Sequence, residues 1–237
     1  MKKEKILFCW SGGKDSAMAL YEILQAGSYD VVALLTTLSA PYDRISMHGV
    51  RRSLLDEQVR RLGIPPANWR GKLEVVSVST SSNEEYEKKM GQLLSRYKVQ
   101  GVETVAFGDI FLEDLRKYRE DKLASIGMKG LFPLWKRDTM DLAHSFIDRG
   151  FKAVLTCVNP KVLDPSFAGR SFDRDLLRDL PGGVDPCGEN GEFHSFVFGG
   201  PLFKEEIPIQ IGERVRRESA GHSFWYCDIL PKGDRFL

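Results

Sequence analysis

Apolar residues in the first half of the chain follow two alternating patterns. Compact apolar runs predict buried strands, and they cover residues 5–10, 31–38, 73–78 and 103–108. The segments between them place apolar residues three and four positions apart, as amphipathic helices do. These segments cover residues 14–25, 49–62 and 83–97. Strands that alternate with helices predict a parallel sheet covered on both faces, which is a Rossmann-like α/β fold.

This alternation ends after residue 108. A charged helix is predicted over residues 113–126, a second helix over 139–149 and a strand over 153–158. Beyond them, the pattern predicts short helical turns and a tail with strands at residues 196–198 and 207–211. We therefore place a boundary between Ile126 and Trp135. The predicted domains are residues 1–128 and a smaller α+β domain at residues 129–237.

The composition is that of a packed globular protein. The chain has 237 residues, 42% of them hydrophobic, with no low-complexity tract. Its formal charge of +1 provides no broad basic field, which counts against nucleic acid as a partner. No segment has the pattern of a signal sequence or a membrane span, so we expect a cytoplasmic protein without membrane contact. The four cysteines are widely spaced and form no Cys-x-x-Cys pair, so reduced thiols are expected.

The most informative residues follow the first predicted strand. The sequence Ser11-Gly12-Gly13-Lys14-Asp15-Ser16 lies between that strand and the first helix. Two glycines let backbone N–H groups converge, and the helix N-terminus adds a partial positive charge. The serine hydroxyls add donors and the lysine adds a full charge. The loop is therefore predicted to bind phosphate groups.

This loop differs from a Walker A sequence, which also ends in Gly-Lys. Phe8 stands where Walker A requires its first glycine, and Asp15 stands where it requires a magnesium-binding Ser or Thr. The loop instead resembles the PP-loop, Ser-Gly-Gly-x-Asp-Ser, of the ATP pyrophosphatases, whose fold is called adenine nucleotide alpha hydrolase-like. In that superfamily, which includes GMP synthetase and asparagine synthetase, the loop binds the β and γ phosphates of ATP while an oxygen of the substrate is adenylylated.

The resemblance implies ATP and Mg²⁺ as cofactors. Lys14 and Asp15 are the implied catalytic residues, and Asp15 is also the candidate magnesium ligand, with a helix cap as its alternative role. His48 lies in Ser-Met-His-Gly after the second strand and resembles a family segment beside the nucleotide; a helix cap is equally compatible with its position. The implied ATP-binding set is Ser11, Gly12, Gly13, Lys14, Asp15, Ser16, His48, Gly108 and Asp109.

Gly108 and Asp109 end the fourth predicted strand, at the carboxyl edge where open α/β sheets bind ligands. The helix that follows carries Arg116, Arg119 and Glu120 at spacings that place several of them on one face. We assign these three residues to substrate binding. An ordinary salt-bridge ladder within the helix explains the same spacing equally well.

Residues 187–196 read Cys-Gly-Glu-Asn-Gly-Glu-Phe-His-Ser-Phe, a turn that presents polar side chains before a strand. The carboxylates of Glu189 and Glu192 could bind an amine, ammonia or magnesium, and His194 could move a proton. We predict that these three residues bind the second substrate across a cleft from the phosphate loop; the alternative is an exposed acidic turn. Cys187 is interpreted as structural, because neighbouring acids disfavour its thiolate.

The order of motifs over nearly the whole chain resembles the diphthine–ammonia ligase family. After the loop come Gly-Asp-Ile with Arg and Glu downstream, Leu-Trp, Gly-Glu-x-Gly-Glu-Phe and Pro-Leu-Phe. The family uses ATP to amidate the carboxylate of diphthine on elongation factor two. Members that make diphthamide usually read Gly-Glu-Gly-Gly-Glu-Tyr-Glu where this chain reads Gly-Glu-Asn-Gly-Glu-Phe-His. This version resembles a related bacterial-type branch that acts on another carboxylate, such as one in cobalamin salvage.

The expected function is an AMP-forming, ATP-dependent carbon–nitrogen ligase. Residues 1–128 would bind ATP and residues 129–237 the substrate. The expected partners are ammonia and a carboxylate that is either a small molecule or borne by a protein, and a homodimer is an open option. One alternative is a tRNA-modifying PP-loop enzyme, although no catalytic cysteine pair is visible. The other is a nucleotide sensor without catalysis.

Overall fold

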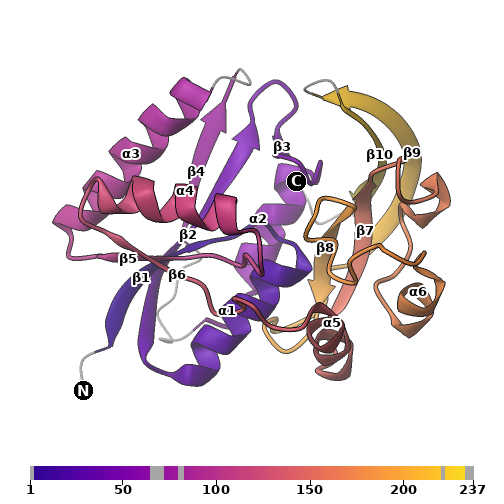
Figure 1. Cartoon of the computed structure of the whole chain (residues 1–237), viewed down its shortest axis with the longest axis horizontal. Helices are drawn as coiled ribbons and strands as arrows, with labels where there is room; N and C mark the ends of the chain where they lie inside the picture. Colours follow the sequence, from indigo (N-terminus) through magenta and orange to yellow (C-terminus); the bar gives the residue numbers. More distant parts are fainter. Residues whose placement is uncertain (1–2, 65–71, 80–82, 220–221, 233–237) are drawn as a thin grey trace.

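The computed structural model describes residues 3–64, 72–79, 83–219 and 222–232, and it places two β-sheets next to each other (Figure 1). The N-terminal half of the chain forms a six-stranded sheet, and the C-terminal half forms a four-stranded sheet. The predicted Rossmann-like α/β class with a smaller second sheet is confirmed.

The first sheet is parallel apart from one short strand. Its strands are β1 (Glu4–Cys9), β2 (Tyr29–Ser39), β3 (Arg44–Ile45), β4 (Leu73–Val78), β5 (Thr104–Ala106) and β6 (Lys129–Leu131). β1 lies in the middle, with β2 and β4 on one side and β5 and β6 on the other. The strand order therefore reverses at β1, and the carboxyl ends of β1 and β5 form the switch point where such sheets bind ligands. β3 pairs antiparallel with the end of β2.

Four helices cover the two faces of this sheet. They are α1 (Lys14–Ala26), α2 (Arg52–Arg61), α3 (Asn83–Val99) and α4 (Glu113–Ala124). Successive side chains of a strand point to opposite faces. In β1, Ile6 and Phe8 accordingly pack into a cluster with α1 and α2, whereas Leu7 packs into a second cluster with α3 and α4. The near-continuous apolar runs of the sequence are explained by this burial on both sides.

The second sheet is antiparallel. Its strands are β7 (Lys152–Val158), β8 (Phe193–Gly199), β9 (Ile209–Ser219) and β10 (His222–Pro231), in the order β8-β7-β10-β9. Helix α5 (Thr139–Asp148) precedes the sheet, and the 3₁₀ turn η1 (Pro165–Phe167) and helix α6 (Arg174–Asp179) connect β7 to β8. The Asp138 carboxylate accepts the Asp141 N–H and caps α5.

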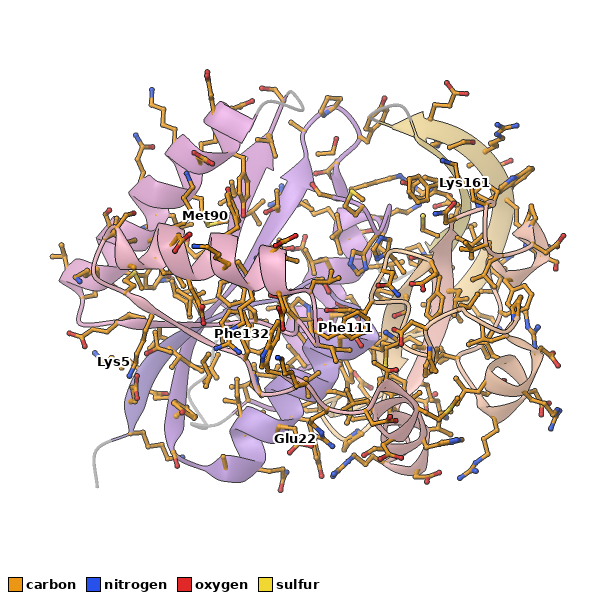
Figure 2. The ribbon with its side chains drawn as sticks, viewed as in Figure 1. Lys5, Glu22, Met90, Phe111, Phe132 and Lys161 are labelled. Atoms are coloured by element: carbon orange, nitrogen blue, oxygen red, sulfur yellow. The ribbon has the colours of Figure 1, made fainter. Side chains whose placement is uncertain are left out.

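The two sheets share one hydrophobic core. The cluster that contains Ile6 and Phe8 of β1 also contains Phe196 and Val197 of β8. Side chains fill the space between the two ribbons in Figure 2, where Phe111 is labelled beside this shared core. The expected division after residue 128 falls just before β6, and β6 pairs with β5, so the first sheet extends to Leu131. The assignment of separate roles to residues 1–128 and 129–237 remains an expectation.

Most predicted elements match the structure to within a few residues, and the differences lie in weakly patterned strands. The strand expected at residues 207–211 begins at Ile209 and continues to Ser219, and β3, β6 and β10 had no counterpart in the prediction. β9 is half charged, and its residues are extended because they pair with β10 along most of its length. None of the helices in the described part of the chain is long and apolar enough to cross a membrane.

Candidate active site between the two sheets

A cavity of about 560 Å³ lies at the carboxyl edge of the first sheet. One wall comes from the loop after β1, from the end of β2 and from the segment after β5, and it includes Ser11 and Ser16. The opposite wall comes from the turn before β8 and from β8 itself, and it includes Glu189 and His194. The structure therefore brings the predicted phosphate loop and the predicted substrate turn to one cavity.

The loop side chains are held by a closed circuit of hydrogen bonds. The Gly13 N–H donates to Ser11 Oγ at 3.3 Å, Ser11 donates to Ser16 Oγ at 3.2 Å, and Ser16 donates to the Gly13 carbonyl at 2.9 Å. Both hydroxyls lie at the N-terminus of α1 and line the cavity. Because the two longer bonds are weak, a phosphate oxygen can replace them.

Gly108 allows the segment after β5 to lie against the start of α1. A Cβ atom at this position would stand 2.9 Å from the Ser16 nitrogen and 3.0 Å from the Asp15 carbonyl carbon. Such distances exclude any side chain without a shift of the backbone. Gly108 and Asp109 both line the cavity, as the sequence predicts for the carboxyl edge.

The two glycines of the loop lie behind the cavity wall rather than on it. Gly12 has a φ of +76° and is buried against Gln58, whose Oε1 would stand 2.6 Å from an added Cβ. Gly13 is buried under His48 and Ser195. Both were predicted to bind ATP, and the structure places them as supports of the residues that line the cavity.

Strand β8 of the second sheet and helix α2 both form hydrogen bonds with this loop. The Lys14 N–H donates to Ser195 Oγ at 3.1 Å, and the Val197 N–H donates to the Gly12 carbonyl at 2.9 Å. Gln58 Nε2 donates to the same carbonyl at 2.9 Å. The sequence analysis assigned no role to Gln58 or Ser195. A signal existed for Gln58, which is the one polar residue in the i, i+4 series with Leu54 and Leu62 on the buried face of α2.

Lys14 is buried and its ammonium group links the two walls. Nζ lies 2.7 Å from both carboxylate oxygens of Asp15 and donates to the Cys187 carbonyl. The rings of Phe172 and Phe193 lie 5.7 and 5.5 Å from it. Burial is the largest single effect on the pKa of Lys14 and lowers it, but the combined effects of Asp15, Cys187 and Glu189 outweigh burial and raise the pKa above its ordinary value. The site therefore contains a permanent cation beside the phosphate loop.

His48 and His194 stack on each other across the cavity wall. Their ring centroids lie 4.6 Å apart at 30°. His48 Nδ1 lies 3.2 Å from the Ser195 carbonyl, which can only accept, so this nitrogen carries the proton and Nε2 has a free lone pair. Burial lowers the pKa of His48 to about 4, and burial together with the neighbouring imidazole lowers that of His194 well below its usual value. Both rings are neutral at pH 7.

The two glutamates of the turn have different positions. Glu189 lines the cavity, and its Oε1 accepts the Ile110 N–H at 2.7 Å. Burial raises its pKa to about 7, against the opposing effect of that hydrogen bond. Glu192 is 5% exposed and lies off the cavity wall; its Oε1 accepts the Asp185 N–H at 3.1 Å and Asn190 Nδ2 at 3.0 Å. Glu192 thus holds the turn together from inside.

Cys187 is a structural residue in this arrangement. Its thiol is buried and donates to the Thr139 carbonyl at 3.3 Å. Burial raises the pKa of the thiol far above its ordinary value, so the thiolate is disfavoured. This agrees with the interpretation made from the sequence.

The charged residues of α4 divide between two places. Arg119 lines the cavity, and its Nε lies 2.7 Å from Asp109 Oδ2 while its guanidinium stacks on Phe107 at 4.4 Å. Arg116 and Glu120 pair with each other at 2.8 Å, and neither lines the cavity. The salt-bridge ladder considered for this helix therefore describes Arg116 and Glu120, and the structure places only Arg119 in the site.

Asp15 is the candidate residue for magnesium. Within the described ranges, no group of three or more His, Cys, Asp and Glu residues is arranged to hold a metal ion. Mg²⁺ bound with a nucleotide needs only one or two carboxylates, because phosphates and water complete its octahedron. Asp15 lines the cavity beside Ser11 and Ser16, so it could supply the one carboxylate that such an ion needs. Its carboxylate would then bind the ion in place of the Lys14 ammonium.

Comparisons with known proteins cover both halves of the chain. The family model of the diphthamide synthase N-terminal domain matches residues 4–130, and that of the diphthamide synthase C-terminal domain matches residues 138–229. A Danio rerio protein named diphthine–ammonia ligase is 31% identical over 223 residues, which cover 86% of this chain and 86% of that protein. The Homo sapiens protein of the same name is 28% identical over 222 residues, with coverages of 86% and 82%.

One solved structure is also similar. It comes from Methanocaldococcus jannaschii and is described as a predicted subunit of tRNA methyltransferase. It has 16% sequence identity and a TM-score of 0.40, and the match covers 86% of this chain and 100% of that one.

Proposed function

Because the chain belongs to the diphthamide synthase family, we propose that this ligase activates a carboxylate with ATP, releases pyrophosphate and amidates the resulting acyl-adenylate with ammonia. The observation that supports the proposal most directly is the meeting of the phosphate loop and the Glu189–His194 turn at one cavity. A ligase of this type must bring an acceptor to the α-phosphorus of ATP, and two facing walls provide that geometry.

In the first step, a carboxylate oxygen attacks the α-phosphorus. The new P–O bond forms as the bond to the β-phosphate oxygen breaks, and pyrophosphate leaves with the electron pair. Ser11, Lys14 and Ser16 line the cavity, and in this proposal their hydroxyls and ammonium stabilise the charge that develops on the leaving pyrophosphate. Mg²⁺, when bound with ATP at Asp15, would neutralise part of the phosphate charge.

In the second step, ammonia attacks the carbonyl carbon of the acyl-adenylate. The C–N bond forms, the C–O bond to the phosphate breaks, and AMP leaves. Starting from an ammonium ion, two protons must be removed in turn. Glu189 has a pKa of about 7, so its carboxylate can accept a proton at neutral pH, while the neutral rings of His48 and His194, which lie close to each other, can accept a hydrogen bond from ammonia.

Diphthine is the first acceptor to test, because the relatives are named for it. This chain differs from the diphthamide-forming pattern at Asn190, Phe193 and His194, and all three residues line the cavity. A carboxylate of another kind is therefore the second acceptor of the proposal. Both acceptors use the same two steps.

Isotope transfer tests the proposed chemistry. The protein is incubated with ATP, Mg²⁺, ammonium and a carboxylate labelled with ¹⁸O, and the AMP is analysed by mass spectrometry. Adenylylation requires one ¹⁸O atom to appear in AMP, since the acceptor oxygen stays with phosphorus when the amide forms. Pyrophosphate and amide should form in equal amounts.

The alternatives give different results in the same assay. A nucleotide sensor would bind ATP and form no AMP with any acceptor. A tRNA-modifying enzyme would form AMP only when tRNA replaces the carboxylate. AMP without ¹⁸O would contradict the acyl-adenylate, because hydrolysis of ATP takes its oxygen from water.

A further inference from the structure

We propose that Gln58 of α2 is a positioning residue for the phosphate site, because its carboxamide fixes the Gly12–Gly13 peptide and attaches it to β8. The inference rests on the proposed function, in which this loop binds the phosphates of ATP. Gln58 does not line the cavity and has no contact with it. Its effect on the nucleotide is therefore exerted through the backbone.

The Gln58 side chain is fully buried, and both the oxygen and the nitrogen of its carboxamide are hydrogen-bonded. It is 0% exposed. Oε1 accepts the indole N–H of Trp10 at 3.0 Å, and Nε2 donates to the carbonyls of Gly12 at 2.9 Å and Val197 at 2.6 Å. An indole can only donate and a carbonyl can only accept, so the carboxamide has one possible orientation.

These bonds determine which way the Gly12–Gly13 peptide points. Its carbonyl accepts from Gln58 Nε2 and also from the Val197 N–H at 2.9 Å. In a trans peptide the N–H lies on the side opposite the carbonyl. The Gly13 N–H is consequently directed toward Ser11 Oγ, which lines the cavity. Two donors on one side of the peptide thus present its N–H on the phosphate side.

The loop could not hold this orientation by itself. Gly12 has a φ of +76°, and glycine adopts such values with little preference over others. The peptide on its C-terminal side is therefore free to turn unless both of its ends are held. The carboxamide also requires glycine at this position, since an added Cβ would stand 2.6 Å from Gln58 Oε1. Gln58 and Gly12 form a matched pair.

The same carboxamide joins the loop to the second sheet. Val197 lies in β8, two residues after Ser195, which accepts the Lys14 N–H. The phosphate loop is thus held in register with the strand that carries His194. A change at Gln58 should weaken phosphate binding and leave the acceptor side of the cavity in place.

The test measures the affinity of the full chain for Mg²⁺-ATP and for Mg²⁺-pyrophosphate by calorimetry. Gln58→Met keeps the length of the side chain and removes all three hydrogen bonds. We expect the Kd for both ligands to rise roughly tenfold, which is the usual effect of one misplaced donor. The KM for ATP should rise by a similar factor, while the KM for the acceptor stays within about twofold.

Gln58→Glu provides a second measurement. Its carboxylate can still accept from Trp10, but it cannot donate to Gly12 or Val197 and places negative charge against two carbonyls. The Kd for pyrophosphate should rise at least as much as in Gln58→Met. Wild-type affinity in either folded variant would overturn the proposal.

Val76→Ala is the control for general loss of stability. Val76 is 3% exposed and lies in the cluster on the other face of the first sheet. It should lower the melting temperature and leave the Kd for pyrophosphate unchanged. If it weakened binding as much as Gln58→Met, the positioning role would be contradicted. If the wild type bound neither ligand, the proposed function itself would fail, and this inference with it.

Discussion

The two walls of the cavity differ in how their polar groups are held. The first wall presents the Ser11 and Ser16 hydroxyls and the Lys14 ammonium, and the Gly13 backbone behind it closes a circuit of hydrogen bonds with the two serines. The second wall presents Glu189, whose pKa burial raises, and His194, whose pKa burial lowers, so burial favours the neutral form of both groups. If the proposed function holds, the loop that would bind phosphate and the carboxyl that would accept a proton lie on opposite walls, so substitutions can change one without the other.

Lys14 is the residue common to both walls. It belongs to the phosphate loop, yet its ammonium donates to the Cys187 carbonyl in the turn of the second wall. The Cys187 carbonyl of the second wall therefore helps to position the charge that Lys14 contributes to the phosphate loop.

Removal of this link should have the largest effect. Lys14→Ala takes away the cation beside the leaving pyrophosphate, and AMP formation should slow by roughly 30- to 1,000-fold, or about 2–4 kcal/mol. Steady-state kinetics of AMP release measures the effect. Lys117→Ala is the control, because Lys117 is exposed and pairs with Asp121 on the same helix. Unchanged AMP formation in Lys14→Ala would contradict the assignment of the loop.

Two substitutions in the turn distinguish Glu189, which lines the cavity, from Glu192, which stabilises the turn. Glu192→Ala leaves the Asp185 N–H and Asn190 without their acceptor, so unfolding should become easier by about 1–3 kcal/mol while turnover per folded molecule changes little. Glu189→Ala should lower turnover by at least roughly tenfold if this carboxyl accepts a proton in the reaction. Chemical denaturation and kinetics distinguish the two. The assignment of Glu192 to the acceptor predicts the reverse for that variant, with full stability and no turnover.

The pH dependence sharpens the same contrast. The raised pKa of Glu189 means that the folded protein binds this proton more tightly than the unfolded chain. Its contribution to stability is thus greatest below pH 4.5 and decreases as the pH rises to about 7. Glu189→Ala should lack this decrease and should be at least as stable as the wild type at pH 8. A parallel pH profile of stability for variant and wild type would show that Glu189 is not buried in the way described.

The smallest effects are expected on α4. Arg119→Ala should raise the KM for a substrate by roughly five- to tenfold, because it leaves Asp109 unpaired at the cavity. Arg116→Ala should change kcat/KM by less than about twofold, since Arg116 pairs with Glu120 away from the cavity. Equal effects of the two substitutions on KM would contradict the conclusion that Arg119, and not Arg116, lies at the site.

The sequence predicts the first wall well because its chemistry lies in consecutive residues. A strand, two glycines and a helix start bring Ser11 to Ser16 close together, although their final orientation depends on contacts with α2 and β8. The same holds for Gly108 and Asp109, whose position follows from the end of one strand.

The second wall and its supports depend on tertiary contacts that no local pattern contains. Glu189 and Glu192 occur in the same turn with equivalent flanking glycines, and only the folded chain decides which of them faces the cavity. Gln58 reads as one polar residue on an amphipathic helix, and its role depends on Gly12 and Val197 lying next to it. The short strand β6 likewise exists because β5 offers it a partner.

The attachment of the phosphate loop to β8 has a consequence for the order in which the protein is made. Lys14 and Ser195 are 181 positions apart in the chain, and the hydrogen bond between them cannot form until most of the polypeptide has left the ribosome. Contacts of such long sequence separation form late, because a long loop must close before they add any stability. A nascent chain that ends before β8 would carry the complete loop motif and still lack the strand that orients it. Nucleotide binding should therefore appear as the last property acquired during synthesis, after the first sheet has already collapsed.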